Sequence, residues 1–199
     1  MDAEIPTSTV EPDKTQPPLS ALRFATPDEL YSAMPQVTRL TQHRPQPDEN
    51  GLDYLMRLRA STTPEEAVTF TAFAALPKMA IWWGYECIRL AGDDLTAADR
   101  AMMELVANWT TYPDNENRYR AAKAALYAPV QSPAVFLGLA VAWSGGPIAP
   151  NDTAPVPAHR TPRAINSSVL SCLARSDLRH RPVRLARFID QAGSLFRAY

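Results

Sequence analysis

The sequence predicts an all-α protein, a single-domain bundle of about eight or nine helices. Three observations support this prediction: hydroxyl–proline pairs that begin helices, apolar residues repeated at helical spacing, and the absence of the sustained alternation that a strand needs. The chain has 199 residues, 46% of them hydrophobic and 21% charged, which is enough for one ordinary core. We expect residues 1–20, which are polar and rich in proline, to be a disordered tail, and residues 21–199 to be the domain.

Nineteen prolines against seven glycines mark where the helices start. A Ser or Thr hydroxyl at the N-cap satisfies a free backbone amide, and proline at the next position presets the helical φ angle. Four such pairs occur: Thr26-Pro27, Thr63-Pro64, Ser132-Pro133 and Thr161-Pro162. Glu66 lies three residues after Thr63, and this spacing predicts a capping box.

These starts and the apolar spacing predict the helix positions. The helices fall near residues 27–41, 49–60, 64–76, 77–91, 97–111, 115–128, 133–144, 162–175 and 182–198. Pro35 should break or kink the first of them. The runs 79–83 and 134–143 are almost entirely apolar, so we expect their helices to be central in the bundle.

A long proline-rich connection, residues 144–157, follows the helix at 133–144, and we call it the strap. Gly145 and Gly146 can supply the left-handed conformation that ends a helix, while Pro155 and Pro157 stiffen the chain that follows. Connections of this length are often functional or packed down as a unit. The strap is therefore either a rigid packing element or a binding loop, and we expect the indole of Trp143, just before it, to be mostly buried.

The net charge, the first 20 residues and the cysteines indicate the classes of partner and the cellular compartment of the protein. The formal net charge is −1, so no overall field attracts nucleic acid or an anionic membrane. The first 20 residues lack the basic start and apolar run of a secretory signal, and no apolar stretch approaches the length of a membrane span. Cys87 and Cys172 are far apart and form neither a disulfide framework nor a metal motif. These features indicate a cytoplasmic protein without a membrane partner.

The sequence contains no arrangement of residues typical of catalysis. No Gly-x-Ser-x-Gly elbow accompanies the three histidines, and no His or Cys pair has metal-ligand spacing. Asp93 and Asp94 are typical of a solvated turn. Glu86 stands alone in an apolar helix, where it can pair with Arg89 or Lys78 or face water. We expect no enzyme activity, no metal and no cofactor.

Two adjacent tryptophans are the first candidates for a binding surface. Trp82 and Trp83 point about a hundred degrees apart on a helix, so we expect one in the core and the other at a boundary or groove. A second candidate is the arginine-rich C-terminal stretch, which could contact phosphates although it lacks interleaved aromatic residues. Its arginines are Arg175, Arg179, Arg181, Arg184 and Arg187.

Two segments carry a resemblance to a known family. The first runs from Leu76-Pro77-Lys78 through Trp82-Trp83 to Cys87-Ile88-Arg89 and is similar to a segment of the LPKREAVWWACLCAR type. The second comprises residues 142–150, 155–157 and 161–166. Together they resemble an uncharacterised all-helical family of Gram-negative bacteria that is associated with type VI secretion gene clusters. The chain departs from the family pattern at Met79 and Ala80 and over residues 84–86, where charged or small residues are replaced.

The resemblance implies an accessory protein of a type VI secretion system, an adaptor or chaperone that binds an effector or a spike or tip protein. The expected protein-binding residues are Lys78, Trp82, Trp83, Trp143, Gly145, Gly146, Pro155 and Pro157. Two alternatives stay open: a small-molecule enzyme or ligand-binding protein with a pocket between helices, and a nucleic-acid-associated regulator that uses the C-terminal arginines.

Overall fold

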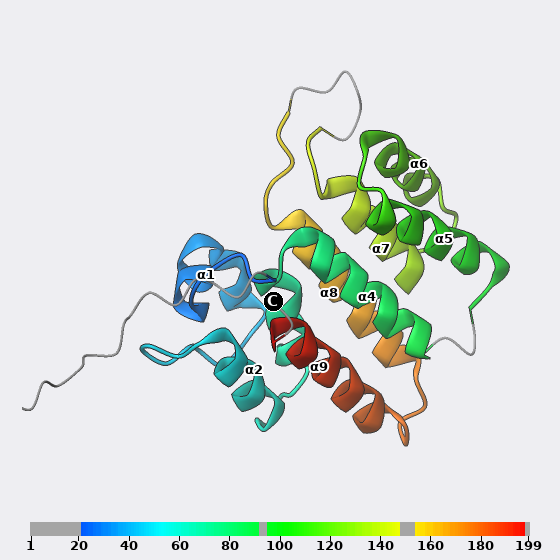
Figure 1. The fold of residues 1–199 in the computed structure, drawn as a ribbon. Coiled ribbons are helices and arrows are strands. Elements are labelled where there is room, and N and C mark those ends of the chain that lie inside the picture. The colour runs from blue at the N-terminus through cyan, green and yellow to red at the C-terminus, as the bar shows by residue number, and fades with distance from the viewer. Residues whose placement is uncertain (1–20, 92–94, 148–153, 198–199) are drawn as a thin grey trace, which may run out of the picture.

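Nine α-helices and one 3₁₀ helix make up the described part of the chain, which comprises residues 21–91, 95–147 and 154–197 of this computed structural model (Figure 1). They are α1 Pro27–Ala33, η1 Pro35–Arg39, α2 Gly51–Arg59, α3 Glu66–Ala74, α4 Pro77–Ala91, α5 Ala97–Thr111, α6 Asn115–Leu126, α7 Pro133–Trp143, α8 Arg160–Arg175 and α9 Arg181–Arg197. The predicted all-α class is confirmed. The expected tail, residues 1–20, lies outside the described residues.

Two of the predicted helix starts are confirmed by their hydrogen bonds. The Thr26 hydroxyl accepts the amide of Glu29 at the start of α1, and the Ser132 hydroxyl accepts the amide of Val135 at the start of α7, each at 3.2 Å. Pro35 also acts as predicted, because α1 ends at Ala33 and the chain continues as η1.

The other two predicted starts were wrong. Thr63 does not cap α3, because its hydroxyl donates to the Glu66 carboxylate at 2.8 Å and so is not the acceptor for an amide of the first turn. Helix α8 starts at Arg160, two residues before the predicted position, and Thr161 is buried inside its first turn. His159 takes the N-cap position of α8, and Thr161 lies inside the helix and does not cap it.

Helices α4 and α8 lie at the centre of the bundle. Helices α5, α6 and α7 gather on one side of them, α1 and α2 lie on the other, and α9 runs back along α4 (Figure 1). Of the two helices predicted to be central, α4 is so, with one side exposed, whereas α7 is buried along most of its length but lies to one side, between α8 and the helices α5 and α6. Glycine permits a close approach between α4 and α7: a Cβ on Gly84 would lie 3.0 Å from the Leu137 side chain.

The chain enters the bundle beside the start of α4. The amide of Leu76 donates to the Ala21 carbonyl at 2.8 Å, and the amide of Arg23 donates to the Ala74 carbonyl at 2.8 Å. These bonds form an isolated antiparallel bridge between Leu22 and Ala75, the sole extended pairing among the described residues. The bridge places Arg23 next to the N-terminal end of α4.

Candidate functional site

The two adjacent tryptophans of α4 lie in different environments, as predicted. Trp83 is 1% exposed, and its indole Nε1 donates to the carbonyl of Phe188 on α9 at 3.0 Å. Trp82, about a hundred degrees further around the helix, is 49% exposed. One tryptophan therefore holds α4 and α9 together, and the other is available to a partner.

A hollow of about 730 Å³ opens beside Trp82, and we call it the α4–α9 groove. It is lined by Lys78, Met79, Trp82, Trp83, Asp190, Gln191, Ser194 and Leu195. The lining combines apolar side chains with one charge of each sign. Asp190 forms an ion pair with Arg59 of α2, whereas Lys78 is exposed at the N-terminal end of α4. Three of the predicted binding residues thus meet at one site.

The remaining predicted residues gather around the strap. Trp143 packs against the core and leaves only a minor part of its surface exposed, in agreement with the expectation of a mostly buried indole. It is the last residue of α7, and the guanidinium of Arg160 lies 5.6 Å from the centroid of its ring. Gly146, with φ +80°, supplies the left-handed turn, and Gly145 has no positive φ.

A second hollow, of about 460 Å³, lies between the strap and the start of α4. It is lined by Arg23, Pro77, Trp143, Ser144, Gly145, Gly146, Pro147, Ala154, Pro155, Val156, Ala158 and Thr161. Pro157 does not line it, and its carbonyl accepts the amide of Arg160 at 2.9 Å. Strap residues 148–153 lie outside the described residues. Apart from Pro157, the predicted binding residues therefore line two separate hollows, both of which include residues from the start of α4.

Sequence reasoning missed Arg118, which holds the strap. This side chain is 2% exposed, and its Nη1 donates to the carbonyls of Ala142 at 3.1 Å and Pro147 at 2.8 Å. Its Nε and Nη2 both reach the Oδ1 of Asn115. The guanidinium thus joins the end of α7 to the first residues of the strap. No sequence signal separates Arg118 from the exposed Arg120 on the same helix.

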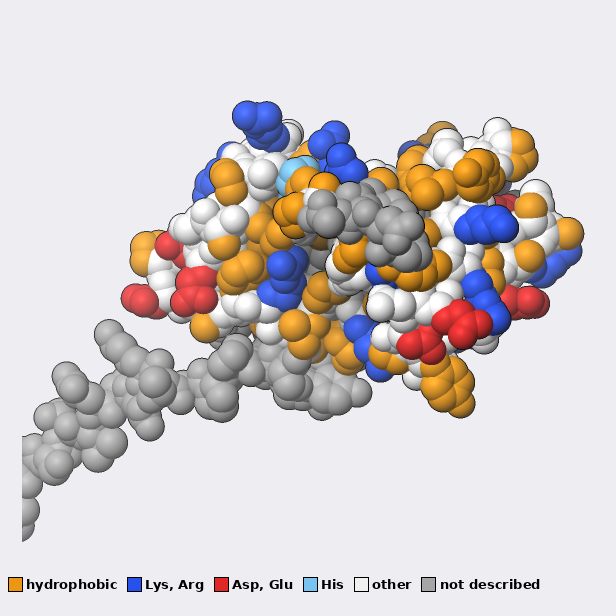
Figure 2. Space-filling model, turned by 90° about the horizontal axis from the view of Figure 1, so that it is seen from above, with side chains coloured by type: hydrophobic (Ala, Val, Ile, Leu, Met, Phe, Trp, Pro, Cys, Tyr) orange, Lys and Arg blue, Asp and Glu red, His pale blue; other side chains and the backbone are white. Residues whose placement is uncertain are grey.

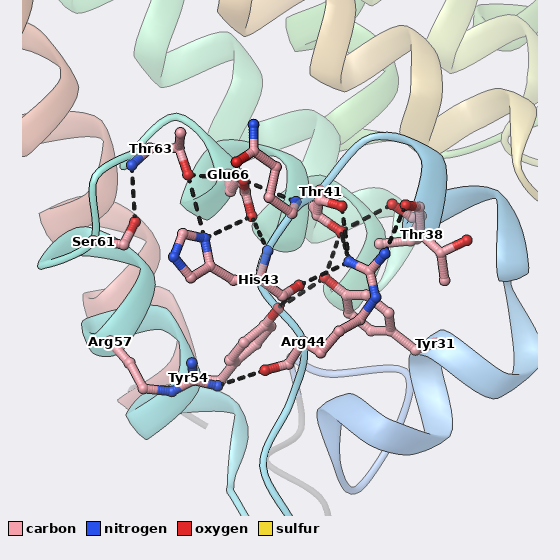
Figure 3. A network of polar contacts seen from close by, with 12 residues as sticks. Tyr31, Thr38, Thr41, His43, Arg44, Tyr54, Arg57, Ser61, Thr63 and Glu66 are labelled. Atoms are coloured by element: carbon pink, nitrogen blue, oxygen red, sulfur yellow. Dashed lines mark hydrogen bonds and ion pairs between the residues drawn. The ribbon is translucent and has the colours of Figure 1, made fainter.

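A polar network fastens residues 40–50 to α2 and α3 (Figure 3). The Glu66 carboxylate accepts the backbone amides of Gln42 and His43 at 2.9 and 3.0 Å, as well as the Thr63 hydroxyl. Burial alone would raise the pKa of Glu66, but these hydrogen bonds lower it below its ordinary value. Tyr54 is part of the same network, and burial raises the pKa of its hydroxyl.

The network's polar groups bind one another. The Tyr31 hydroxyl lies 2.8 Å from that of Tyr54 and 2.9 Å from that of Thr41, and the Arg44 guanidinium donates to the carbonyls of Thr38, Thr41 and His43. Because these donors and acceptors are satisfied within the chain, the network stabilises the fold and is not the candidate site.

The comparison with protein families identifies one match, to a family of unknown function, DUF6931, whose model covers residues 54–196. The chain belongs to the DUF6931 family. The comparison with curated proteins found no match, and neither did the comparison with solved structures. The matched region contains the α4–α9 groove, the strap and Arg118, whereas His43 and Arg44 precede it.

The other chemically interesting residues of this DUF6931 chain do not form a second candidate site. Burial raises the pKa of the Cys87 thiol well above its ordinary value and that of Cys172 to about 11, so both thiols are protonated at neutral pH and are poor nucleophiles. Glu86 pairs with Arg89 at 2.6 Å. Within the described residues, no three His, Cys, Asp or Glu side chains are placed to share a metal ion. Asp93 and Asp94 lie outside the described residues.

The C-terminal arginines do not form a continuous phosphate-binding surface. Arg181 donates to the carbonyl of Ala174 at 2.9 Å, and Arg184 donates to the Ser176 hydroxyl at 2.8 Å, so both guanidiniums are turned toward the protein. Arg175, Arg179 and Arg187 remain exposed. Among the described helices, none is long and apolar enough to cross a bilayer.

Proposed function

We propose that this DUF6931 chain is a non-catalytic, cytoplasmic adaptor or chaperone of a type VI secretion system, and that it binds an effector or a spike or tip protein. The secretion context follows from the resemblance of the segments around Trp82-Trp83 and the strap. The single structural observation that supports binding is the exposure of Trp82 over the α4–α9 groove.

Trp82 has the environment of a binding hot spot. Its half-exposed ring lines a hollow that also includes the apolar side chains of Met79 and Leu195. Tryptophan is enriched among the residues that carry most of the binding energy at protein interfaces. The neighbouring Trp83, hydrogen-bonded to Phe188, fixes α4 against α9, so a partner binds a preformed surface and little ordering entropy is lost.

The groove fits an amphipathic helix of the partner. It lies between two helices, and an apolar helical stripe can cover Met79, Trp82 and Leu195. The charges in its lining select the orientation of that helix. Asp190 is already paired with Arg59, so Lys78 is the charge available to an acidic side chain of the partner.

The test measures binding of the purified effector, spike or tip proteins encoded beside this chain, by isothermal titration calorimetry. We expect Trp82→Ala to weaken the complex by about tenfold or more and Lys78→Glu to weaken it as well. Tyr127→Ala is the matched control, because that aromatic ring is 82% exposed and lies outside the groove. Unchanged affinity of the Trp82→Ala protein would refute the groove, and failure of every such protein to bind would refute the proposed partner class.

The strap is tested in the same assay. Pro155 lines the strap hollow and Pro157 fixes the entry to α8. If the strap is a binding loop, Pro155→Ala and Pro157→Ala weaken the complex without lowering the melting temperature. Without these prolines the free strap has more conformations, and it loses more entropy when the partner binds. If it only packs against the domain, both variants bind as the unaltered protein does.

A further inference from the structure

A third hollow lies along the outer side of α7 and α8, and we call it the α7–α8 groove. Its volume is about 300 Å³, and it is lined by Phe136, Leu139, Trp143, His159, Arg160, Arg163, Ala164 and Ser167. It shares Trp143 with the strap hollow and no residue with the α4–α9 groove. Its binding properties are therefore separable from those of the function proposed above.

The two walls of this groove differ in chemistry. On α7, Phe136, Leu139 and Trp143 follow one another at spacings of three and four residues, so they share one face, and all three are partly exposed. This wall is apolar. At a rise of about 1.5 Å per residue it extends for roughly 10 Å, or two helical turns.

The opposite wall, on α8, is cationic. Arg160 and Arg163 are exposed and share one face, and neither takes part in an ion pair with another described residue. They belong to the first turn of a 16-residue helix, whose N-terminal end adds a partial positive charge. None of the lining residues is acidic.

Basic side chains also predominate on the face of the molecule around this groove. Seen from the strap end, basic side chains are spread across the face, whereas the acidic ones lie toward two of its sides (Figure 2). The guanidinium of Arg160 already lies against the Trp143 ring, so the cationic and apolar walls meet at this residue pair.

We propose that the α7–α8 groove binds an acidic amphipathic helix of a partner protein. Apolar side chains of that helix, spaced by three and four residues, cover Phe136, Leu139 and Trp143. Carboxylates on the adjoining face bind the guanidiniums of Arg160 and Arg163, which carry planar donors that match a carboxylate. Since this groove and the α4–α9 groove share no residue, one chain can hold two partner helices at once.

The experiment uses the full chain and two synthetic amphipathic peptides. Both have leucines at the same helical spacing, and one carries glutamates where the other carries lysines. Binding is followed by the indole N–H signals of the four tryptophans in two-dimensional NMR, with the Trp143 signal assigned from Trp143→Phe. The glutamate peptide should shift the Trp143 signal and leave that of Trp82 in place. Its affinity should fall as salt rises from about 0.05 to about 0.5 M, while the lysine peptide should bind more weakly.

Charge reversal on α8 should weaken the glutamate peptide. The double variant Arg160→Glu and Arg163→Glu should lose about tenfold or more in affinity. Arg187→Glu is the matched control, an exposed arginine of α9 away from the groove. If the double variant melts well below the unaltered protein, the neutral pair Arg160→Gln and Arg163→Gln replaces it.

Four outcomes would overturn the proposal. The lysine peptide could bind as tightly as the glutamate peptide, or the double variant could bind as the control does. Inorganic phosphate alone could reproduce the Trp143 shift and compete with the peptide, which would make the groove a site for a small anion. Finally, neutralising the chain's own acidic N-terminal residues could shift the Trp143 signal without added peptide, which would make that segment the occupant. The neutralised chain carries Asp2→Asn, Glu4→Gln, Glu11→Gln and Asp13→Asn.

Discussion

The Nη1 of Arg118 donates to the carbonyl of Pro147 across 2.8 Å, and so joins α6 to the strap. The same nitrogen also donates to the Ala142 carbonyl in the last turn of α7. One buried cation therefore satisfies two carbonyls that have no helical partner, a role that water or a capping residue fills at most helix ends. Arg118 lines none of the three hollows, yet it sets the start of the segment that encloses one of them.

We expect Arg118→Met to lower the free energy of unfolding by about 1–3 kcal/mol, because the buried carbonyl of Ala142 and the partly buried carbonyl of Pro147 lose their donor. Hydrogen exchange should also become faster in residues 144–147 and 154–158. Chemical denaturation and exchange mass spectrometry measure the two effects. Arg120→Met, on the same helix but exposed, is the control and should change neither. If hydrogen exchange in the strap is as slow in the Arg118→Met protein as in the unaltered protein, Arg118 does not anchor the strap.

The adjacent tryptophans of α4 should differ in their effect on stability. Trp83→Ala removes a fully buried ring and its hydrogen bond to Phe188, so we expect a loss of about 3–5 kcal/mol. Trp82→Ala should change stability by about 1 kcal/mol or less, because half of that ring is already in solvent. Trp143→Ala should fall between them, since its ring is partly buried. Urea denaturation of the three proteins gives the order directly, and equal losses for Trp82 and Trp83 would contradict the structure.

Glu66 should make stability depend on pH in the acid range. Its folded-state pKa is lowered from an ordinary value of 4.5, so the unfolded chain takes up its proton first as the pH falls. The stabilisation is therefore complete above about pH 4.5 and is lost as the pH falls toward the lower folded-state pKa. Thermal melts from neutral to acid pH should show a shallower decline for Glu66→Gln than for the unaltered protein. The decline will not vanish, because the pKa values of Glu49 and Asp99 are also lowered.

The control for this measurement is Glu65→Gln, which changes the neighbouring exposed carboxylate. It should leave the acid decline nearly unchanged. If Glu65→Gln flattens the decline as much as Glu66→Gln does, the hydrogen bonds from Gln42 and His43 do not stabilise the charged form of Glu66 in the way described.

Two glycines provide a test of packing. A Cβ on Gly138 would lie 2.5 Å from the Sδ of Met102 and 3.1 Å from the Cβ of Ala125, so the Met102 side chain must change its conformation and Ala125 of α6 must shift slightly. We expect Gly138→Ala to destabilise the protein by about 1–3 kcal/mol. A Cβ on Gly145 meets no atom within 4 Å and the residue has no positive φ, so Gly145→Ala should be neutral. Differential scanning calorimetry compares the two, and a neutral Gly138→Ala would show that these helices pack more loosely.

The helices and their order were predictable from the sequence because their signals are local. A hydroxyl followed by proline specifies a helix start through atoms three residues apart, and this identified the beginnings of α1 and α7. The prediction failed at Thr63 because the Glu66 carboxylate binds backbone amides 23 and 24 residues earlier in the chain. No local pattern contains that contact.

The binding surfaces, too, were predictable only where the signal is local. Helical periodicity alone implied that Trp82 and Trp83 point in different directions, but it could not tell which ring is buried. That was decided by α9, whose Phe188 carbonyl lies 105 residues from Trp83 and accepts its N–H. Likewise, the apolar stripe of α7 and the arginines of α8 are each visible in the sequence, whereas the groove between them exists only because the two helices pack side by side. The sequence by itself determined the helices and the composition of their faces. Which faces meet, and which stay open to a partner, depends on contacts between distant segments, and only the tertiary structure decided it.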